Sequence, residues 1–290
     1  MGFDAGHNRV YLVPFITIGR PDNTPTSNTR EEEKHVLHLR QLIQIMGDLT
    51  DNRFVLALNA GTEMHYRQEL LATYQQMVHA GSELAMQLSH QILAGVSEEA
   101  QYRMWSTQLQ AGKERLERMG IAPTACRIAD HAWPAFMPRL LAEQELMADY
   151  SCFPGLNQPE RHNVWPREQF SADYLPVDIR SPWHSQPCSR ILTIPLGSDG
   201  LGTQDINTLN IEKSDLNNLS RIWDTLIARA ETAGKCQIVH CLFQSSSVAV
   251  PAWLDRWQRF LSFVPERQGQ FITSVDAQAL QERFNREFIK

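Results

Sequence analysis

Side chains able to bind charge or move protons stand at the ends of successive apolar runs of this sequence. They are Gln87 and His90 on the first run, Arg127, Asp130 and His131 on the next, then Asp149, with His240 inside a later run. An imidazole can transfer a proton near neutral pH, and a guanidinium can bind a carboxylate or phosphate. Because catalytic groups gather at the carboxyl ends of parallel strands in a barrel, this repeated placement predicts one shared site.

The segments that must position these side chains alternate between strand-like and helix-like patterns. Apolar runs rich in β-branched residues predict strands near 10–18, 54–58, 83–88, 125–129, 150–153, 190–196, 237–243 and 270–273. Helical spacing and capping residues predict helices near 31–48, 68–79, 97–119, 134–147, 214–233, 251–263 and from 274 onward. We therefore expect an α/β fold, a distorted (β/α) barrel of about seven parallel strands. A doubly wound open sheet is the alternative.

We expect one domain over residues 1–290, interrupted by a long irregular loop at about 154–189. A loop of this length is typically functional or disordered. Trp165 and Trp183 argue against disorder and suggest a lid or a surface that stacks on a sugar. The alternative is that these indoles pack together as the small core of the loop.

The net charge of the chain and the lengths of its apolar runs limit the partners and the cellular location that we expect for it. The net charge is −6, with no long basic run, so nucleic acid is not the expected partner. No apolar run approaches the roughly 20 residues that span a bilayer. The first ten residues lack the apolar core of a secretory signal, and a cytoplasmic location is expected. The five cysteines include no CxxC pair and are expected to be reduced thiols, not a zinc site.

Several motifs resemble, in order and spacing, those of the NodB-homology polysaccharide deacetylases, the carbohydrate esterase family four type. The segment 81–87 (GSELAMQ) resembles the family's Gly-His-Glu-Ile-(Gly/Ala)-x-His motif, and 97–119 resembles the long helix that follows. Arg127 falls on the family arginine, Asp149 on an aspartate, and His240 on the histidine of a late strand. The resemblance is specific between Gly81 and Ser151 and weak elsewhere.

This resemblance implies a seven-stranded distorted barrel that binds one divalent metal ion through one Asp and two His. A second Asp would act as the base on the metal-bound water, and the late His as the acid. Here Thr17 and Ile18 stand at the two aspartates, and Gln87 at the first metal histidine. His90, or Gln91, stands at the second metal histidine, so the metal site is lost or rebuilt. Replacement carboxylates could come from turns that follow earlier strands, at Asp22 and Glu63.

Three functional hypotheses remain from the sequence. The first is a divergent deacetylase-like hydrolase that removes an N- or O-acyl group from a sugar. Its catalytic residues are His240, Asp149 and Arg127, its metal ligand is His90, and its substrate contacts are Gln87, Asp130, His131, Trp165 and Trp183. The second is an inactive barrel that binds a saccharide or a protein partner, and the third is an unrelated metal-free hydrolase or isomerase using Asp130, His131 and His240.

Each candidate also has a structural interpretation. His240 could be a neutral core histidine, and Arg127 could form an ion pair with Asp149 or Asp130. His90 could be an exposed turn residue. Asp130 and His131 are adjacent, so on an extended chain only one of them would face the site.

Overall fold

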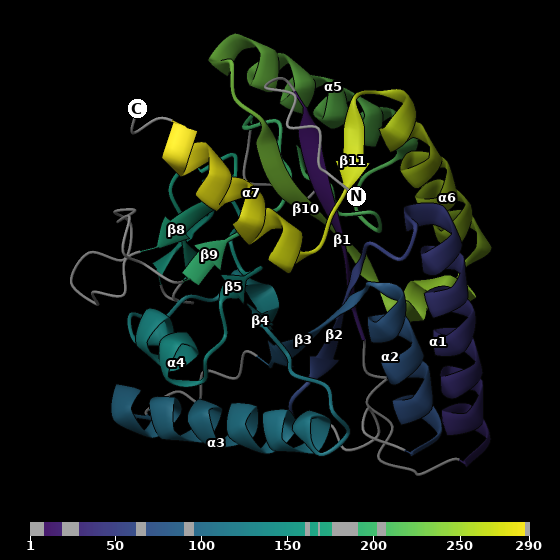
Figure 1. Cartoon of the computed structure of the whole chain (residues 1–290), viewed down its shortest axis with the longest axis vertical. Helices are drawn as coiled ribbons and strands as arrows, with labels where there is room; N and C mark the ends of the chain where they lie inside the picture. Colours follow the sequence, from purple (N-terminus) through teal and green to yellow (C-terminus); the bar gives the residue numbers. More distant parts are fainter. Residues whose placement is uncertain are drawn as a thin grey trace.

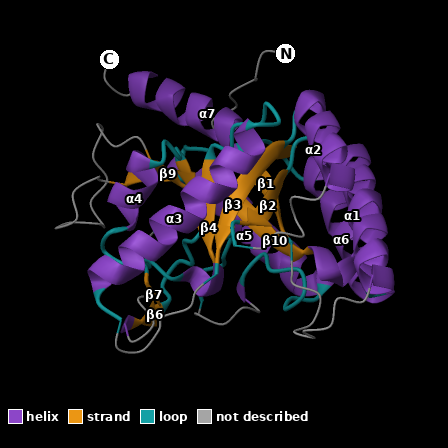
Figure 2. Cartoon of the chain, turned by 90° about the horizontal axis from the view of Figure 1, so that it is seen from below, coloured by secondary structure: helices purple, strands orange, loops and turns teal. Residues whose placement is uncertain are grey.

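The computed structural model of the chain has a curled parallel sheet at its centre and helices around it (Figures 1 and 2). It describes residues 9–18, 29–61, 68–89, 96–159, 163–167, 169–175, 191–201 and 207–287. Within these ranges seven parallel strands are paired in the order β10-β1-β2-β3-β4-β5-β9. Their bounds are β1 Val10–Thr17, β2 Val55–Asn59, β3 Glu83–Leu88, β4 Ala125–Ile128, β5 Ala148–Asp149, β9 Ile191–Thr193 and β10 Gln237–Gln244.

The first strand contains a proline in a position that tolerates one. β1 (VYLVPFIT) is fully buried and pairs with β10 along its whole length. On its other side Val10–Leu12 pairs with β11 (Gly269–Phe271), and residues 15–17 pair with β2. Pro14 falls between those two pairings, where the N–H that proline lacks is not needed for the ladder.

The two ends of the curled sheet meet, so the strands form a closed, distorted barrel. Leu196, three residues beyond β9, forms a parallel bridge with His240 of β10. Backbone hydrogen bonds from His240 N to Pro195 O and from Gly197 N to His240 O, both 2.9 Å, join the two segments. This closure confirms the predicted barrel and excludes the open doubly wound sheet.

Helices form a ring outside the barrel, with α1, α2 and α6 on one side and α3 and α4 on the other (Figures 1 and 2). The helix bounds are α1 Thr29–Thr50, α2 Gln68–Ala80, α3 Glu98–Glu117, α4 Met137–Glu143, α5 Leu216–Ala233, α6 Pro251–Glu266 and α7 Ser274–Glu287. Short 3-10 turns lie at Ala129–His131 and Ser245–Ala249. No helix among the described residues is long and apolar enough to cross a membrane.

Alternation along the strands separates two cores. One face of each strand packs against the outer helices, through side chains such as Leu56, Met86 and Val239. The other face fills the barrel, and includes small residues such as Ala57 and Ala85. The small residues leave room for large inner side chains, as expected for a narrow barrel.

The amino ends of the strands are covered by α7. At the start of β3, Glu83 accepts hydrogen bonds from the Thr124 hydroxyl, the Ser274 hydroxyl and the Ser274 backbone N–H. Burial raises the pKa of the Glu83 carboxyl, while the two hydroxyl bonds act in the opposite direction. Because α7 begins at Ser274, its first turn closes this end, and the carboxyl ends remain as the mouth.

The loop predicted at about 154–189 contains short strands where the structure describes it. β6 (Asn157–Gln158) and β7 (Asn163–Val164) form an antiparallel pair, and β8 (Asp173–Leu175) pairs antiparallel with β9. The segment has no alternating apolar pattern, so the sequence does not predict these strands. They form because each pairs with another strand of the chain. The strand predicted at 150–153 is also displaced, since β5 ends at Asp149.

The closure makes a prediction about Gly197. A Cβ at this position would lie 2.5 Å from Leu209 Cδ1 and 2.9 Å from Leu209 Cγ, inside the packed closure. We expect Gly197→Ala to lower the free energy of unfolding by about 1–3 kcal/mol through overpacking. Urea unfolding would measure this, with Gly61→Ala as the matched control, because a Cβ there would lie 3.6 Å from Asn59 Oδ1. Equal stability of the two variants would contradict the close approach.

Candidate active site

The mouth of the barrel carries a row of polar side chains on neighbouring strands. Asn59 of β2, Gln87 of β3 and Arg127 of β4 are partners in register. Each continues the inner face of its strand, since each stands two residues after an inner alanine, at 57, 85 and 125 respectively. Asn59 Nδ2 donates to Ser89 Oγ at 2.8 Å, whereas Gln87 Oε1 is buried with no partner among the described residues. The predicted grouping of Gln87 and Arg127 is therefore present.

His240 lies on the inner face of β10 and is completely buried. Its ring contacts Tyr150 and Phe15, with centroids 5.3 Å and 5.7 Å away. Nδ1 lies 2.8 Å from Ile194 O, and because a carbonyl only accepts, Nδ1 carries the proton. The other nitrogen, Nε2, is an acceptor that has no partner within the described part of the chain.

Burial lowers the pKa of His240 from its ordinary 6.5 to about 3, and the nearby charge of Arg127 adds to this effect. The imidazole is therefore neutral at pH 7 and presents a lone pair to the barrel interior. Nε2 can therefore accept a proton or a hydrogen bond. It carries no proton of its own, so it cannot act as an acid before it has acted as a base.

His131 brings a second neutral imidazole to the same region. Asp130 and His131 follow β4 with φ values of 57° and 59°, a left-handed backbone that is uncommon outside glycine. His131 Nδ1 lies 3.0 Å from Ser151 O, and the His131 carbonyl accepts from Trp165 Nε1 at 2.8 Å. Burial, and next the charge of Arg127, lower its pKa to about 3. The left-handed turn is thus stabilised by two hydrogen bonds, one from the His131 ring and one to its carbonyl. Strained backbone of this kind is typical of functional positions.

Asp149 does not lie in the mouth. Its neighbours Ala148 and Tyr150 point into the barrel, so alternation turns Asp149 to the outer face, beside Cys126 of β4. Asp149 Oδ1 accepts from Ser151 N at 3.0 Å and from Ser151 Oγ at 2.6 Å. Burial raises its pKa to about 7, which the two bonds from Ser151 oppose. The outward orientation does not support the catalytic role predicted for Asp149, whose hydrogen bonds go to Ser151, the residue whose carbonyl binds His131 Nδ1.

Arg127 is a buried cation, with 6% of its surface exposed. Its Nε is buried with no hydrogen-bond partner among the described residues, and no described carboxylate forms an ion pair with it. The structural ion pair with Asp149 or Asp130 that the sequence suggested is thus absent from the described residues. Burial lowers the pKa of Arg127 to about 10, although the charges of Asp130, Asp149 and Glu212 act to raise it.

Glu212 is a carboxylate at the mouth that sequence reasoning missed. Its Oε1 accepts from Gln244 N at 2.6 Å, at the carboxyl end of β10, and from Ser247 Oγ at 2.8 Å. Its Oε2 is buried and has no partner among the described residues, and burial raises the pKa of this carboxyl. The neighbouring Asn210 is bridged to Leu242 of β10, and its Oδ1 is likewise buried and unpartnered in the described chain. The alternation of Leu209, Asn210 and Ile211 was the signal that could have found this segment.

The remaining predicted residues are placed as follows. Asp130 is exposed at the rim, with its carbonyl bonded to Asn163 Nδ2, so only His131 of this adjacent pair turns inward. Trp165 is 3% exposed and its ring lies 5.1 Å from that of Trp133. Trp165 therefore packs against Trp133, outside its own loop, and is too buried for the sugar-stacking role, while the alternative pairing with Trp183 lies outside the described residues. His90, Trp183, Asp22 and Glu63 lie outside the described residues.

The described donors do not fit a divalent metal ion of the kind the resemblance implied. Thr17 and Ile18 are buried where two aspartates were expected, and Gln87 replaces a histidine. Within the described ranges no three His, Cys, Asp or Glu side chains come together as a metal-binding group. The positive charge of Arg127 would also oppose a dication at this mouth. The expected metal, with His90 as its ligand, stays a prediction.

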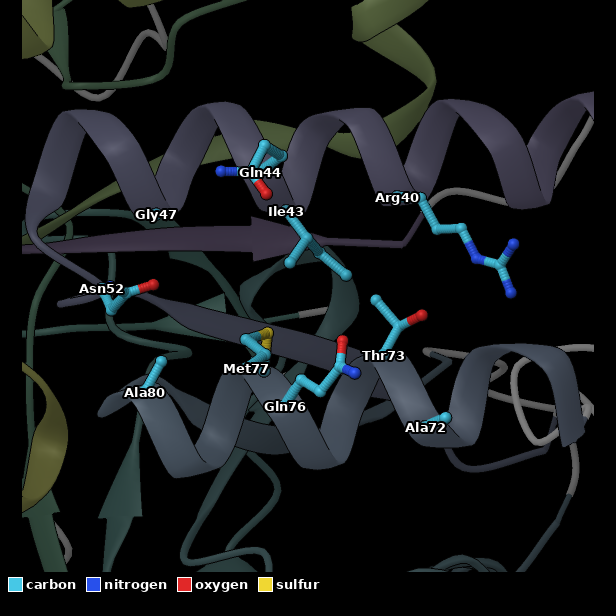
Figure 3. Close-up of a pocket in the computed structure, with 10 residues that line it drawn as sticks. All are labelled: Arg40, Ile43, Gln44, Gly47, Asn52, Ala72, Thr73, Gln76, Met77 and Ala80. Carbon is cyan, nitrogen blue, oxygen red and sulfur yellow. The ribbon is translucent and has the colours of Figure 1, made fainter.

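A separate hollow lies outside the barrel, between α1 and α2 (Figure 3). It has a volume of about 520 Å³ and is lined by Arg40, Ile43, Gln44, Gly47, Asn52, Ala72, Thr73, Gln76, Met77 and Ala80. Arg40, its only charged lining residue, donates to the Glu69 carbonyl. This hollow contains none of the predicted site residues and does not reach the mouth.

Solved structures with the same fold support the predicted resemblance. A protein assigned as a polysaccharide deacetylase from Mycobacterium smegmatis superposes with a TM-score of 0.64 and 12% identity, covering 99% of this chain and 94% of that one. PuuE allantoinase superposes with a TM-score of 0.62 and 14% identity, covering 95% of this chain and 91% of that one. A protein assigned as a polysaccharide deacetylase from Pseudomonas aeruginosa PAO1 superposes with a TM-score of 0.61 and 14% identity, covering 96% of this chain and 92% of that one.

These likenesses establish the fold, a deacetylase-type distorted barrel, over nearly the whole chain. No family model and no curated protein matches the sequence. At such low identity the side chains of the mouth must be interpreted from their own geometry.

The buried histidines predict a pH dependence of stability. The folded state keeps His240 neutral down to about pH 3, whereas the unfolded chain takes up a proton near pH 6.5, so falling pH favours unfolding between these values. We expect His240→Gln to remove up to about 1.4 kcal/mol per pH unit of this slope.

Urea unfolding of the wild type and the variant at several values between pH 4 and 7 would measure the difference. Asp149, whose pKa is raised, acts in the opposite sense in both proteins and cancels in the comparison. His79→Gln, on the exposed surface of α2, is the matched control. An unchanged slope in His240→Gln would contradict a neutral buried imidazole.

Proposed function

We propose that the mouth hydrolyses an N- or O-acyl group of a sugar without relying on the metal triad of the family it resembles. The observation that carries this proposal is the buried, unpartnered Nε2 of His240 within electrostatic reach of the Arg127 guanidinium. A base that takes the proton of a water molecule and a fixed cation that stabilises the acyl oxygen are the two groups that acyl transfer to water requires.

In this proposal His240 Nε2 accepts a proton from a water molecule as the water oxygen attacks the acyl carbon. The acyl oxygen gains negative charge, which the guanidinium of Arg127 stabilises in a site with little competing water. The tetrahedral intermediate then collapses, and the imidazolium returns its proton to the departing nitrogen or oxygen. His240 thus acts first as base and then as acid, and Nδ1–H stays bonded to Ile194 O throughout.

Other residues position these groups. The Asp149–Ser151 hydrogen bonds hold the segment whose carbonyl binds His131 Nδ1. His131 and Gln87 then offer further acceptors to the hydroxyl groups of a sugar. The raised pKa of Glu212 makes this carboxyl a second group able to exchange a proton at the mouth.

A second function, saccharide binding without turnover, is favoured by one specific observation. The positions of the two family aspartates and the first metal histidine carry Thr17, Ile18 and Gln87. A pKa of about 3 also makes His240 a weak base. Under this alternative the mouth keeps its polar side chains for recognition only.

Acetate release distinguishes the two functions. We expect the purified chain to release acetate from a panel of N- and O-acetylated sugars, with and without EDTA, and His240→Gln to lower kcat by at least about 100-fold. His79→Gln should retain wild-type turnover. Allantoin belongs in the panel because one similar structure is an allantoinase.

Two results would count against hydrolysis of a sugar. Binding of acetylated sugars with no acetate release would leave the binding function in its place. Turnover of allantoin alone would move the substrate away from sugars while keeping the role of His240.

A further inference from the structure

The mouth contains one buried positive charge, Arg127, on which the carboxyls of Asp130, Asp149 and Glu212 act only through their charge, without an ion pair among the described residues. Arg127 is 6% exposed, and its Nε is buried with no hydrogen-bond partner among the described residues. A charge taken out of water is costly unless it is paired and hydrogen-bonded. The planar guanidinium therefore provides a ready site for an anion, and a carboxylate matches its paired donors in a bidentate arrangement.

The groups near Arg127 are of the opposite kind, because they accept hydrogen bonds. His240 Nε2, Gln87 Oε1, Asn210 Oδ1 and Glu212 Oε2 are buried acceptors with no partner in the described residues. His131 uses Nδ1 to donate to Ser151 O, so its Nε2 is an acceptor as well. Each such acceptor needs a donor from the ligand, since an unmade buried hydrogen bond is costly.

A buried cation next to several hydrogen-bond acceptors limits the chemical class of ligand that the mouth can bind. A neutral sugar satisfies the acceptors with its hydroxyl groups but leaves Arg127 without an anion. Inorganic phosphate pairs with Arg127 but turns its own oxygens toward a ring of acceptors. A single carboxylate surrounded by hydroxyl groups satisfies both requirements.

We infer that the mouth takes an acidic sugar, with its carboxylate on Arg127 and its hydroxyl groups on the acceptors contributed by β3, β10 and the 207–212 segment. This inference rests on the site of the proposed function and narrows its substrate class to sugars that carry a carboxylate, such as uronic acids. Arg127 then binds the carboxylate through two of its five N–H donors, and the remaining donors are left for the acyl oxygen of the proposed hydrolysis.

The inference is tested with a matched pair of probes that differ only at C6: methyl β-D-glucuronide and methyl β-D-glucoside. Isothermal titration calorimetry with the full chain should give a Kd at least ten-fold lower for the glucuronide. In Arg127→Gln the glucuronide affinity should fall by about ten- to hundred-fold, the usual worth of a charged hydrogen bond. Arg139→Gln is the matched control, since Arg139 is exposed on α4 and paired with Glu143.

A second measurement separates binding from folding. In the absence of ligand, Arg127→Gln should unfold at a higher temperature than the wild type, because it removes a buried unpaired charge. A lower unfolding temperature together with unchanged glucuronide affinity would assign Arg127 to the core and overturn the inference.

Other outcomes also decide. Equal affinity for the two probes, no binding of either, or tighter binding of inorganic phosphate would overturn the acidic sugar. Acetate release from neutral sugars with no preference for the glucuronide would overturn this inference and leave the proposed hydrolysis intact. Glucuronide binding that depends on Arg127, without acetate release, would support the inference and overturn hydrolysis.

Discussion

The backbone pairing between Leu196 and His240 is the interaction on which both the barrel and its chemistry depend. It joins the last parallel segment to β10 and so turns an open sheet into a closed one. The same segment supplies the carbonyl of Ile194 that fixes the proton of His240 on Nδ1. Closure therefore determines which nitrogen of the imidazole faces the interior, and the fold sets the protonation state of its candidate base.

The mouth is built at a cost to stability. Two imidazoles are held neutral by burial, and a guanidinium is buried without a partner among the described residues. The amino ends of the strands show the opposite arrangement, because each hydrogen bond around Glu83 is made to a partner within the chain. The buried polar atoms at the amino end of the barrel therefore have hydrogen-bond partners within the chain, whereas several at the mouth have none among the described residues. This contrast is typical of a protein whose unpaired polar atoms bind a ligand.

The departures from the deacetylase motifs form a consistent set. Where the resemblance placed two acidic metal ligands this chain has Thr17 and Ile18, and Arg127 lies in the field of the Asp130, Asp149 and Glu212 carboxyls. Asp149, on the family position of an aspartate, is turned outward and stabilises the strained turn at His131 through Ser151. The barrel fold is thus present with a different set of polar side chains at its mouth than the resemblance implied.

The sequence by itself determined the alternation of strands and helices and the approximate position of the mouth, and it favoured a parallel barrel over an open sheet without deciding the closure. It could do so because apolar periodicity and capping residues are local signals, and because parallel strands place their carboxyl ends together. It also grouped Gln87, Arg127 and His240 correctly, since each lies on or directly after a buried run.

Only the tertiary structure decided which way the remaining side chains face. Asp149 faces outward because Tyr150 occupies the barrel, and Trp165 is buried because its indole bonds to the strained turn at His131. Glu212 reaches the mouth because its segment pairs with β10 across a gap of about thirty residues in sequence. Facing, burial and long-range pairing depend on neighbours that no local pattern specifies, and these determine the chemistry of the site.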